Sequence, residues 1–144
     1  MEWNYYDTFI TVSADCPAEY GKEPPDKKDG KTKPGIEFEL IANHPYVYTQ
    51  EELLYQVHIR HKHISDEVLA AQGNQLREDF FRNPMPCMRA SMLPKKYGWG
   101  VHFNSEGKAA LVPVESEDYQ HFLEGEKGDV KIIAAMRNSK KVSK

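Results

Sequence analysis

The sequence predicts a single α+β domain in which a small antiparallel sheet packs against an αα-hairpin and short C-terminal helices. A length of 144 residues is enough for one hydrophobic core, so we expect one domain spanning residues 1–144. The hydrophobic share of 40% and the charged share of 28% are those of an ordinary globular protein. Short β-branched and aromatic runs alternate with segments of helical periodicity, which favours a mixed architecture.

The first two predicted strands flank a long polar loop. Residues 5–13, YYDTFITVS, are rich in aromatic and β-branched side chains, which predicts a strand. Residues 17–35 hold four prolines, three glycines, five lysines and four acids, which is typical of a solvated loop, although loops this long can also act as lids. Residues 36–42, IEFELIA, begin with alternating apolar and acidic positions and therefore predict a half-exposed strand.

Two helices follow, over residues 50–61 and 65–82. Thr49 and Glu52 have the spacing of a capping box, and the apolar positions after them recur at helical intervals. The link between the helices is short, which predicts an αα-hairpin. The expected buried face of the second helix includes Val68, Leu69, Leu76 and Phe80, with Gln72 as a further candidate. Prolines at positions 84 and 86 end it.

The C-terminal third predicts a β-hairpin and short helices. Strands are expected over residues 97–103 and 108–114, joined by a turn at NSEG. Ser116 is placed to cap a short helix over residues 117–123. The apolar run 130–136 suits either a strand or a helix, and we favour a helix. Residues 137–144 form a basic tail that is expected to fray.

A basic segment is the strongest candidate for a functional site. Residues 80–105 contain four positive charges and no acid, in a chain whose net charge is −3. Arginine offers a planar fork for carboxylate or phosphate, and an aromatic ring can stack on the flat part of a ligand. The candidate ligand-binding residues are Arg89, Ser91, Lys95, Lys96, Tyr97, Trp99 and His102.

The same charges have a simpler interpretation. Residues 106–129 carry seven acids and two lysines, so the two segments can neutralise each other. Surface ion pairs of this kind contribute little to stability and need no ligand. Gly98 and Gly100 flank Trp99, and their bare face can accept either an aromatic ring of the protein, which we favour, or a flat ligand.

Two catalytic hypotheses and one metal hypothesis rest on fewer residues. Cys87 could act as a nucleophile if the chain brings His102 to it as a base, and Lys95 is an alternative nucleophile. No known signature surrounds Cys87, which also reads as a small buried hydrophobe. The histidines His58, His61 and His63 include a pair at helical spacing, but no carboxylate at metal-ligand spacing accompanies them, and we expect no metal site.

The overall composition excludes some functional classes. A net charge of −3 argues against a general nucleic-acid binder. No run approaches the roughly 20 apolar residues needed to cross a bilayer. The N-terminal residues lack the pattern of a secretory signal, and the two cysteines suit free thiols in a reducing compartment, so a cytoplasmic location is expected. No P-loop or GxGxxG motif is present, and no cofactor is expected.

Three longer motifs carry a resemblance to a known family. The segments YDTFITV, PYVYTQEELL and RASMLPKKYGWGVHF are similar to a family of small bacterial proteins of unknown function, over most of the chain. The resemblance implies a bacterial cytoplasmic protein, and it implies no activity, cofactor or catalytic residue.

We therefore expect a small binding module with a site for an anionic small molecule on the 87–102 segment. The alternatives are an enzyme that uses Cys87 with His102, or Lys95, and a homo-oligomeric interaction protein without a small-molecule site.

Overall fold

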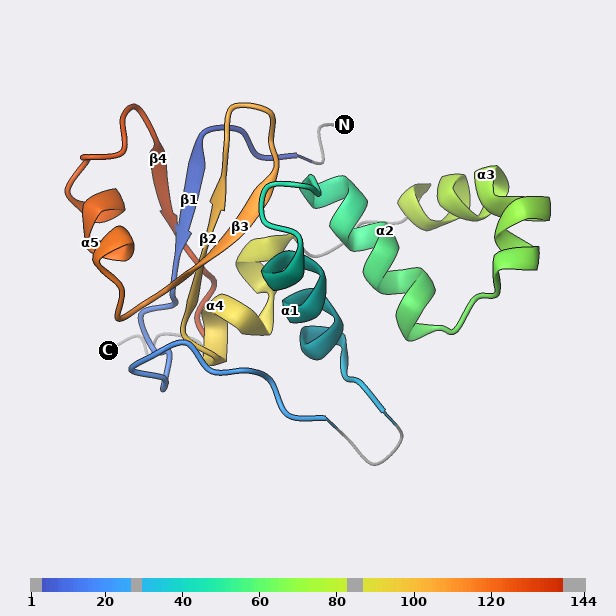
Figure 1. Cartoon of the computed structure of the whole chain (residues 1–144), viewed down its shortest axis with the longest axis horizontal. Coiled ribbons are helices and arrows are strands. Elements are labelled where there is room, and N and C mark those ends of the chain that lie inside the picture. The colour runs from blue at the N-terminus through green and yellow to red at the C-terminus, as the bar shows by residue number, and fades with distance from the viewer. Residues whose placement is uncertain (1–3, 27–29, 83–86, 139–144) are drawn as a thin grey trace, which may run out of the picture.

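The computed structural model describes residues 4–26, 30–82 and 87–138, and it has an α+β fold with helices on both faces of a four-stranded sheet (Figure 1). The strand order is β3-β2-β1-β4, with β2 antiparallel to both of its neighbours and β1 parallel to β4. The strands are β1 (Thr8–Thr11), β2 (Trp99–Phe103), β3 (Ala109–Pro113) and β4 (Lys131–Ala134).

The helices are α1 (Lys33–Asn43), α2 (Gln50–His61), α3 (Asp66–Arg82), α4 (Met92–Lys96) and α5 (Glu117–Leu123), with a 3₁₀ turn η1 (Met88–Ala90) before α4. The predicted α2 is confirmed, and Thr49 and Glu52 form both hydrogen bonds of the capping box. Ser116 caps α5 as expected, by accepting a hydrogen bond from the Tyr119 amide.

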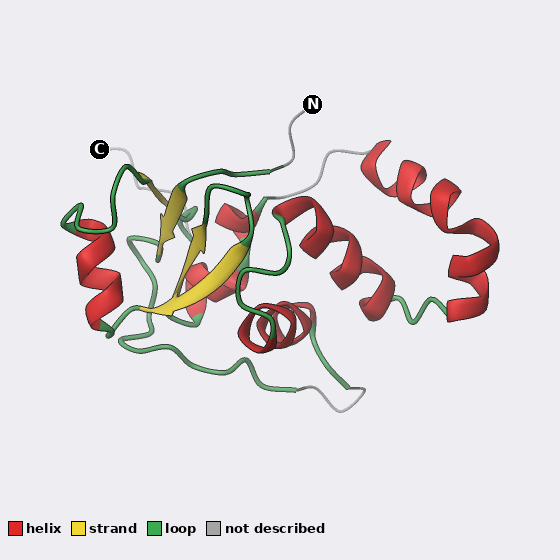
Figure 2. Ribbon diagram, turned by 45° about the horizontal axis from the view of Figure 1, so that its top comes forward, coloured by secondary structure: helices red, strands yellow, loops and turns green. Residues whose placement is uncertain are grey.

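Two apolar clusters lie on the two faces of the sheet. The larger one packs α1, α2 and α4 against the face that carries Ile10, Val101 and Phe103. The smaller one packs α5 against the opposite face, where the Phe9 ring stacks on Phe122 with centroids 4.5 Å apart. Figure 2 shows this arrangement, with α5 alone on one side of the sheet.

The prediction of a strand over residues 36–42 is wrong, because these residues belong to α1. Thr32 caps the helix by accepting from the Gly35 amide, and Pro34 occupies the first turn, where its missing N–H costs nothing. Ile36 and Leu40 then lie one helical turn apart and both are buried. The alternation of apolar and acidic residues was compatible with a strand only over the first five positions.

The prediction of a helix over residues 130–136 is also wrong. This run contains β4, which pairs in parallel with β1 in the register Thr8 to Lys131. The sheet is therefore mixed and not purely antiparallel. Two adjacent β-branched residues, Ile132 and Ile133, favour the strand, and the pairing partner lies more than a hundred residues away in the sequence.

The αα-hairpin is confirmed, but α3 is less buried than expected. No residue of α3 is buried, and Val68 is 38% exposed. The helix contacts α2 through aromatic pairs such as Tyr55 with Phe80, and it extends away from the sheet (Figures 1 and 2). The prolines expected to end α3 lie outside the described residues.

The two expected irregular segments are held to the body of the protein where they are described. In the polar loop, the Lys22 amide donates to the Tyr97 carbonyl at 2.8 Å and the Lys22 carbonyl accepts from the Trp99 indole at 2.8 Å. In the basic tail, the Asn138 amide donates to the Asp15 carboxylate at 3.0 Å. Residues 139–144 of the tail lie outside the described residues.

Among the residues described, no helix is long and apolar enough to cross a membrane.

Candidate functional site

The basic side chains of the 87–102 segment do not converge on one cavity. Arg89 lies within η1, and its Nε donates to the Ala134 carbonyl of β4 at 2.8 Å, so its guanidinium lies at the sheet edge. Lys95 and Lys96 end α4, and neither ammonium forms an ion pair with any residue in the described parts of the chain. None of these three cations lines the cavities described below.

Trp99 and His102 face opposite sides of the sheet, as the alternation along β2 predicts. The Trp99 ring packs against Phe38 of α1, with centroids 5.4 Å apart. His102 contacts Phe122 of α5, and its Nδ1 is 2.9 Å from the Tyr46 hydroxyl. The two side chains cannot hold one small ligand between them.

The two glycines beside Trp99 are required for different structural reasons. A Cβ on Gly100 would stand 2.6 Å from the Phe9 ring and 2.9 Å from the Tyr119 ring, so protein aromatics cover this position, as we favoured. Gly98 instead adopts a φ of +79°, and a Cβ there would meet the Tyr20 backbone.

Cys87 and His102 are not brought together. The Cys87 thiol accepts a hydrogen bond from the Tyr5 hydroxyl at 3.3 Å, on the face of the sheet covered by α1 and α2. Ser91 is also committed, because its hydroxyl accepts from the Leu93 amide to cap α4 and donates to the Glu37 carboxylate. Within the described residues, no hydrogen bond joins Cys87 or Ser91 to a histidine ring.

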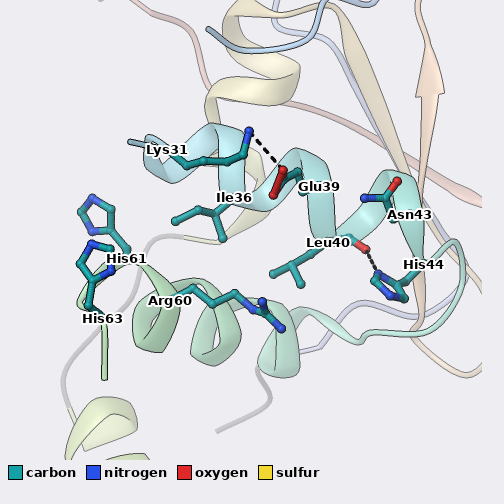
Figure 3. Close-up of a pocket in the computed structure, with 9 residues that line it drawn as sticks. All are labelled: Lys31, Ile36, Glu39, Leu40, Asn43, His44, Arg60, His61 and His63. Atoms are coloured by element: carbon teal, nitrogen blue, oxygen red, sulfur yellow. Dashed lines mark hydrogen bonds and ion pairs between the residues drawn. The ribbon is translucent and has the colours of Figure 1, made fainter. Parts of the chain in front are cut away.

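In the described part of the chain, three cavities lie beside α1 and α2. One is a groove of about 410 Å³ that lies between α1 and the C-terminal half of α2 (Figure 3). A second cavity, of about 540 Å³, adjoins it at the start of α1 and shares Lys31, His61 and His63 with it. Tyr97, one of the predicted ligand-binding residues, lines this second cavity. We call the first cavity the α1–α2 groove.

The α1–α2 groove has an apolar floor and a polar rim. Ile36 and Leu40 project from α1 into the space between the helices (Figure 3). His61 and His63 lie beside each other at one end, while Asn43 and His44 lie at the other. His44 donates from Nδ1 to the Leu40 carbonyl at 3.1 Å, which leaves its Nε2 as the free ring nitrogen.

The charges of the groove are mainly positive. Its lining contains one acid, Glu39, whose carboxylate is 3.1 Å from the Lys31 ammonium. Lys31 also contacts Asp26, and these pairs raise the pKa of Lys31. Arg60 extends along α2 beneath Leu40, and it has no carboxylate partner within the described segments (Figure 3). The groove therefore contains an arginine available to an external anion.

His63 holds an uncommon backbone conformation. Its φ is +54°, at the position after the C-cap where glycine is usual. The His63 amide donates to the Arg60 carbonyl and the Ile64 amide to the Ile59 carbonyl, which is the Schellman pattern of helix termination. A side chain in this region of φ costs about 1–2 kcal/mol relative to glycine, so the imidazole is present at the expense of stability.

Comparison with known protein families shows to which family the chain belongs. The family described as "Family of unknown function (DUF6157)" matches residues 1–141. The chain belongs to this family. The match confirms the resemblance to a family of unknown function that the sequence motifs predicted. No curated protein and no solved structure matches the chain.

For this member of DUF6157, the sequence analysis considered the groove histidines only as metal ligands, and it expected no metal site there. His58 and His61 share a side of α2 by spacing, but His58 lines a different cavity from His61 and His63. The useful signal was the cationic run from Arg60 to His63 at the end of a helix. Its partner wall on α1 is distant in sequence, and α1 was expected to be a strand.

Proposed function

We propose that the protein is a small-molecule binding module whose ligand is an amphipathic organic anion held in the α1–α2 groove. The ligand class is an alkyl carboxylate or an alkyl phosphate. Its charged group pairs with Arg60, and its apolar part lies on Ile36 and Leu40. The anion expected on the 87–102 segment is thereby assigned to a different surface.

The observation that carries this proposal is the guanidinium of Arg60, which forms no ion pair with any described residue, in a groove whose one described carboxylate is already bonded to Lys31. Arginine binds carboxylate and phosphate through two parallel hydrogen bonds, which gives geometric specificity. His61 and His63 supply further N–H donors at the same rim (Figure 3). A net negative protein that collects cations in one groove selects anions at that place.

The size and lining of the groove suit a small ligand. Its volume of about 410 Å³ falls in the range of small-molecule pockets, about 300–1,000 Å³. Apolar side chains at the floor and a few polar groups at the rim are the usual division of roles in such pockets. The apolar part of the ligand supplies affinity, and the arginine fixes its orientation.

We further propose a cytoplasmic location. Cys16 and Cys87 are free thiols, which supports a reducing compartment. The enzyme alternative that uses Cys87 with His102 gains less support, because the two side chains lie on opposite faces of the sheet.

Isothermal titration calorimetry with n-butyl phosphate and butanoate tests the proposal, at ~0.02 M and ~0.15 M salt. We expect saturable binding that weakens at the higher salt, and an affinity at least tenfold lower in Arg60→Gln. Arg82→Gln is the matched control, because Arg82 lies on α3 and pairs with Asp79 on the same helix. Equal affinities in the wild type and Arg60→Gln, or no binding at millimolar ligand, would overturn the proposal.

A further inference from the structure

A separate cavity of about 200 Å³ lies on the other side of α1, between α1, α2 and the start of α4. Its walls are mostly apolar. They include Pro34, Leu54, Val57, Phe80, Ala90 and Met92. We call it the Glu37 cavity, because Glu37 is the one acid in its described lining. It shares no lining residue with the α1–α2 groove.

The Glu37 carboxylate has one hydrogen-bond partner among the residues that the structure describes. Its Oε1 accepts from the Ser91 hydroxyl at 3.1 Å, and the described residues provide no second hydrogen bond and no ion pair. A carboxylate needs more than one donor to replace the water it loses on burial. Because Glu37 lines the cavity, its carboxylate has acceptor positions left for a donor bound there.

The other polar groups around the cavity do not neutralise this charge. Lys33 lies one turn before Glu37 on α1, but its exposed ammonium forms no ion pair with Glu37, and its charge acts on the carboxylate only at longer range. His58 of α2 packs its ring on Phe80 at 4.5 Å, and burial, followed by the charges of Lys62, Lys33 and His61, lowers its pKa. Cys87 faces the same cavity and accepts from the Tyr5 hydroxyl.

We propose that the Glu37 cavity binds a small organic cation, a primary ammonium or guanidinium on a short apolar chain, with the Glu37 carboxylate as its counter-ion. The cation supplies the missing donors to the carboxylate, and the alkyl chain replaces water along Leu54, Val57 and Met92. The ring of Phe80 adds a face to which a cation is attracted. The volume of about 200 Å³ limits the ligand to a few carbon atoms.

The electrostatics of Glu37 agree with this role. Burial raises the pKa of Glu37 from 4.5 to about 7, against the opposing effects of the Ser91 hydrogen bond and the Lys33 charge. A cation bound to the carboxylate reverses the penalty of burial and favours the ionised form. Binding of the cation is therefore expected to release a proton near neutral pH and to strengthen as the pH rises from 6 to 8.

The test uses the intact protein with three ligands of matched size, n-butylammonium, n-butanol and butanoate, followed by ¹H–¹³C NMR of the methyl groups. We expect n-butylammonium to shift the Met92, Leu54 and Ala90 methyls saturably and to leave Ile132 of β4 unshifted. Glu37→Gln is expected to reduce the affinity at least tenfold, because the amide keeps the shape and loses the charge. Glu78→Gln removes a carboxylate from the exposed side of α3 and is expected to keep the affinity.

Lys33→Gln gives an independent arm. Removal of the nearby positive charge is expected to strengthen n-butylammonium binding, and a weakened affinity would overturn the proposal. Equal binding of n-butanol and n-butylammonium would show an apolar cavity without charge selection. Preferential binding of butanoate at these methyls would show that a protonated Glu37 or Lys33 recognises an anion, and it would also overturn the proposal. Shifts with n-butylammonium that persist at unchanged affinity in Glu37→Gln would likewise overturn the proposal.

Discussion

The Ser91 hydroxyl donates to the Glu37 carboxylate at 3.1 Å while it accepts from the Leu93 amide at 3.2 Å. One hydroxyl thus caps α4 and provides the single hydrogen bond by which the described residues hold the half-buried Glu37 carboxylate of α1. The sequence separation of 54 residues places this contact beyond any local pattern. The ionisation of Glu37 is consequently linked to the packing of α1 against α4.

The first prediction concerns the stability of the protein as a function of pH. The pKa of Glu37 rises from 4.5 to about 7 through burial, so the folded state holds this proton more tightly than the unfolded state. The protonated Glu37 side chain therefore contributes to the free energy of unfolding. This contribution is fully present below pH 4.5 and is lost as the pH rises to about 7. At ~1.4 kcal/mol per pKa unit, the loss between pH 5 and pH 8 is about 2–3 kcal/mol.

Glu37→Gln is expected to remove this decline, because the amide has no proton to lose. Urea denaturation of both proteins at pH 5, 6, 7 and 8 measures the difference. Glu78→Gln, with an exposed carboxylate, serves as the control and should follow the wild type. Parallel curves for the wild type and Glu37→Gln would show that Glu37 does not titrate abnormally.

The second prediction separates stability from binding at His63. In His63→Gly the positive φ no longer strains a side chain, so the free energy of unfolding should rise by about 0.5–1 kcal/mol. The same change removes an imidazole from the rim of the α1–α2 groove, and affinity for n-butyl phosphate should fall. Thermal denaturation and calorimetry measure the two effects. A variant that is less stable than the wild type would show that His63 makes packing contacts that outweigh the strain.

The third prediction compares two glycine positions. In Gly100→Ala the new Cβ would stand 2.6 Å from the Phe9 ring, which is fully buried and stacked on Phe122. We expect a loss of about 1–3 kcal/mol. Gly73 lies in the middle of α3, and the Cβ of Gly73→Ala would have no atom within 4 Å. We expect this variant to be more stable by about 0.5–1 kcal/mol. Denaturant unfolding of both variants checks the pair, and a neutral Gly100→Ala would contradict the packing described.

The fourth prediction concerns the polar loop. Trp99→Phe keeps the aromatic packing on Phe38 and removes the indole hydrogen bond to the Lys22 carbonyl. The expected cost is about 1 kcal/mol, together with faster hydrogen exchange of the Lys22 amide, which donates to the Tyr97 carbonyl. Hydrogen exchange followed by NMR measures it. Unchanged protection of the Lys22 amide would show that other contacts hold this part of the loop.

Local signals explain which elements could be predicted from the sequence. The capping box of Thr49 and Glu52 placed α2 at residues 50–61, and the alternation along β2 separated Trp99 from His102. The start of α1 was also marked locally, by Thr32 and Pro34, but the apolar and acidic alternation after them had the period of a strand. Ile41 broke that alternation and was the residue that favoured a helix.

The remaining features depend on partners that are distant in sequence. β4 is defined by its parallel pairing with β1, so an apolar run alone could not distinguish strand from helix. The α1–α2 groove joins Lys31 and Ile36 to Arg60 and His63, and it forms only because α1 is a helix lying across α2. The charge excess on residues 80–105 was real in the sequence, but the fold directs Arg89 to the sheet edge.

The most direct test of the central claim is a ¹H–¹⁵N NMR titration of the wild-type protein with n-butyl phosphate. If the anion binds in the α1–α2 groove, we expect saturable shifts at the amides of Leu40, Arg60 and His63, which belong to this groove, and their loss in Arg60→Gln. Shifts centred on Lys95, Lys96 and Trp99, retained in Arg60→Gln and lost in the double variant Lys95→Ala with Lys96→Ala, would contradict it and return the anion site to the 87–102 segment.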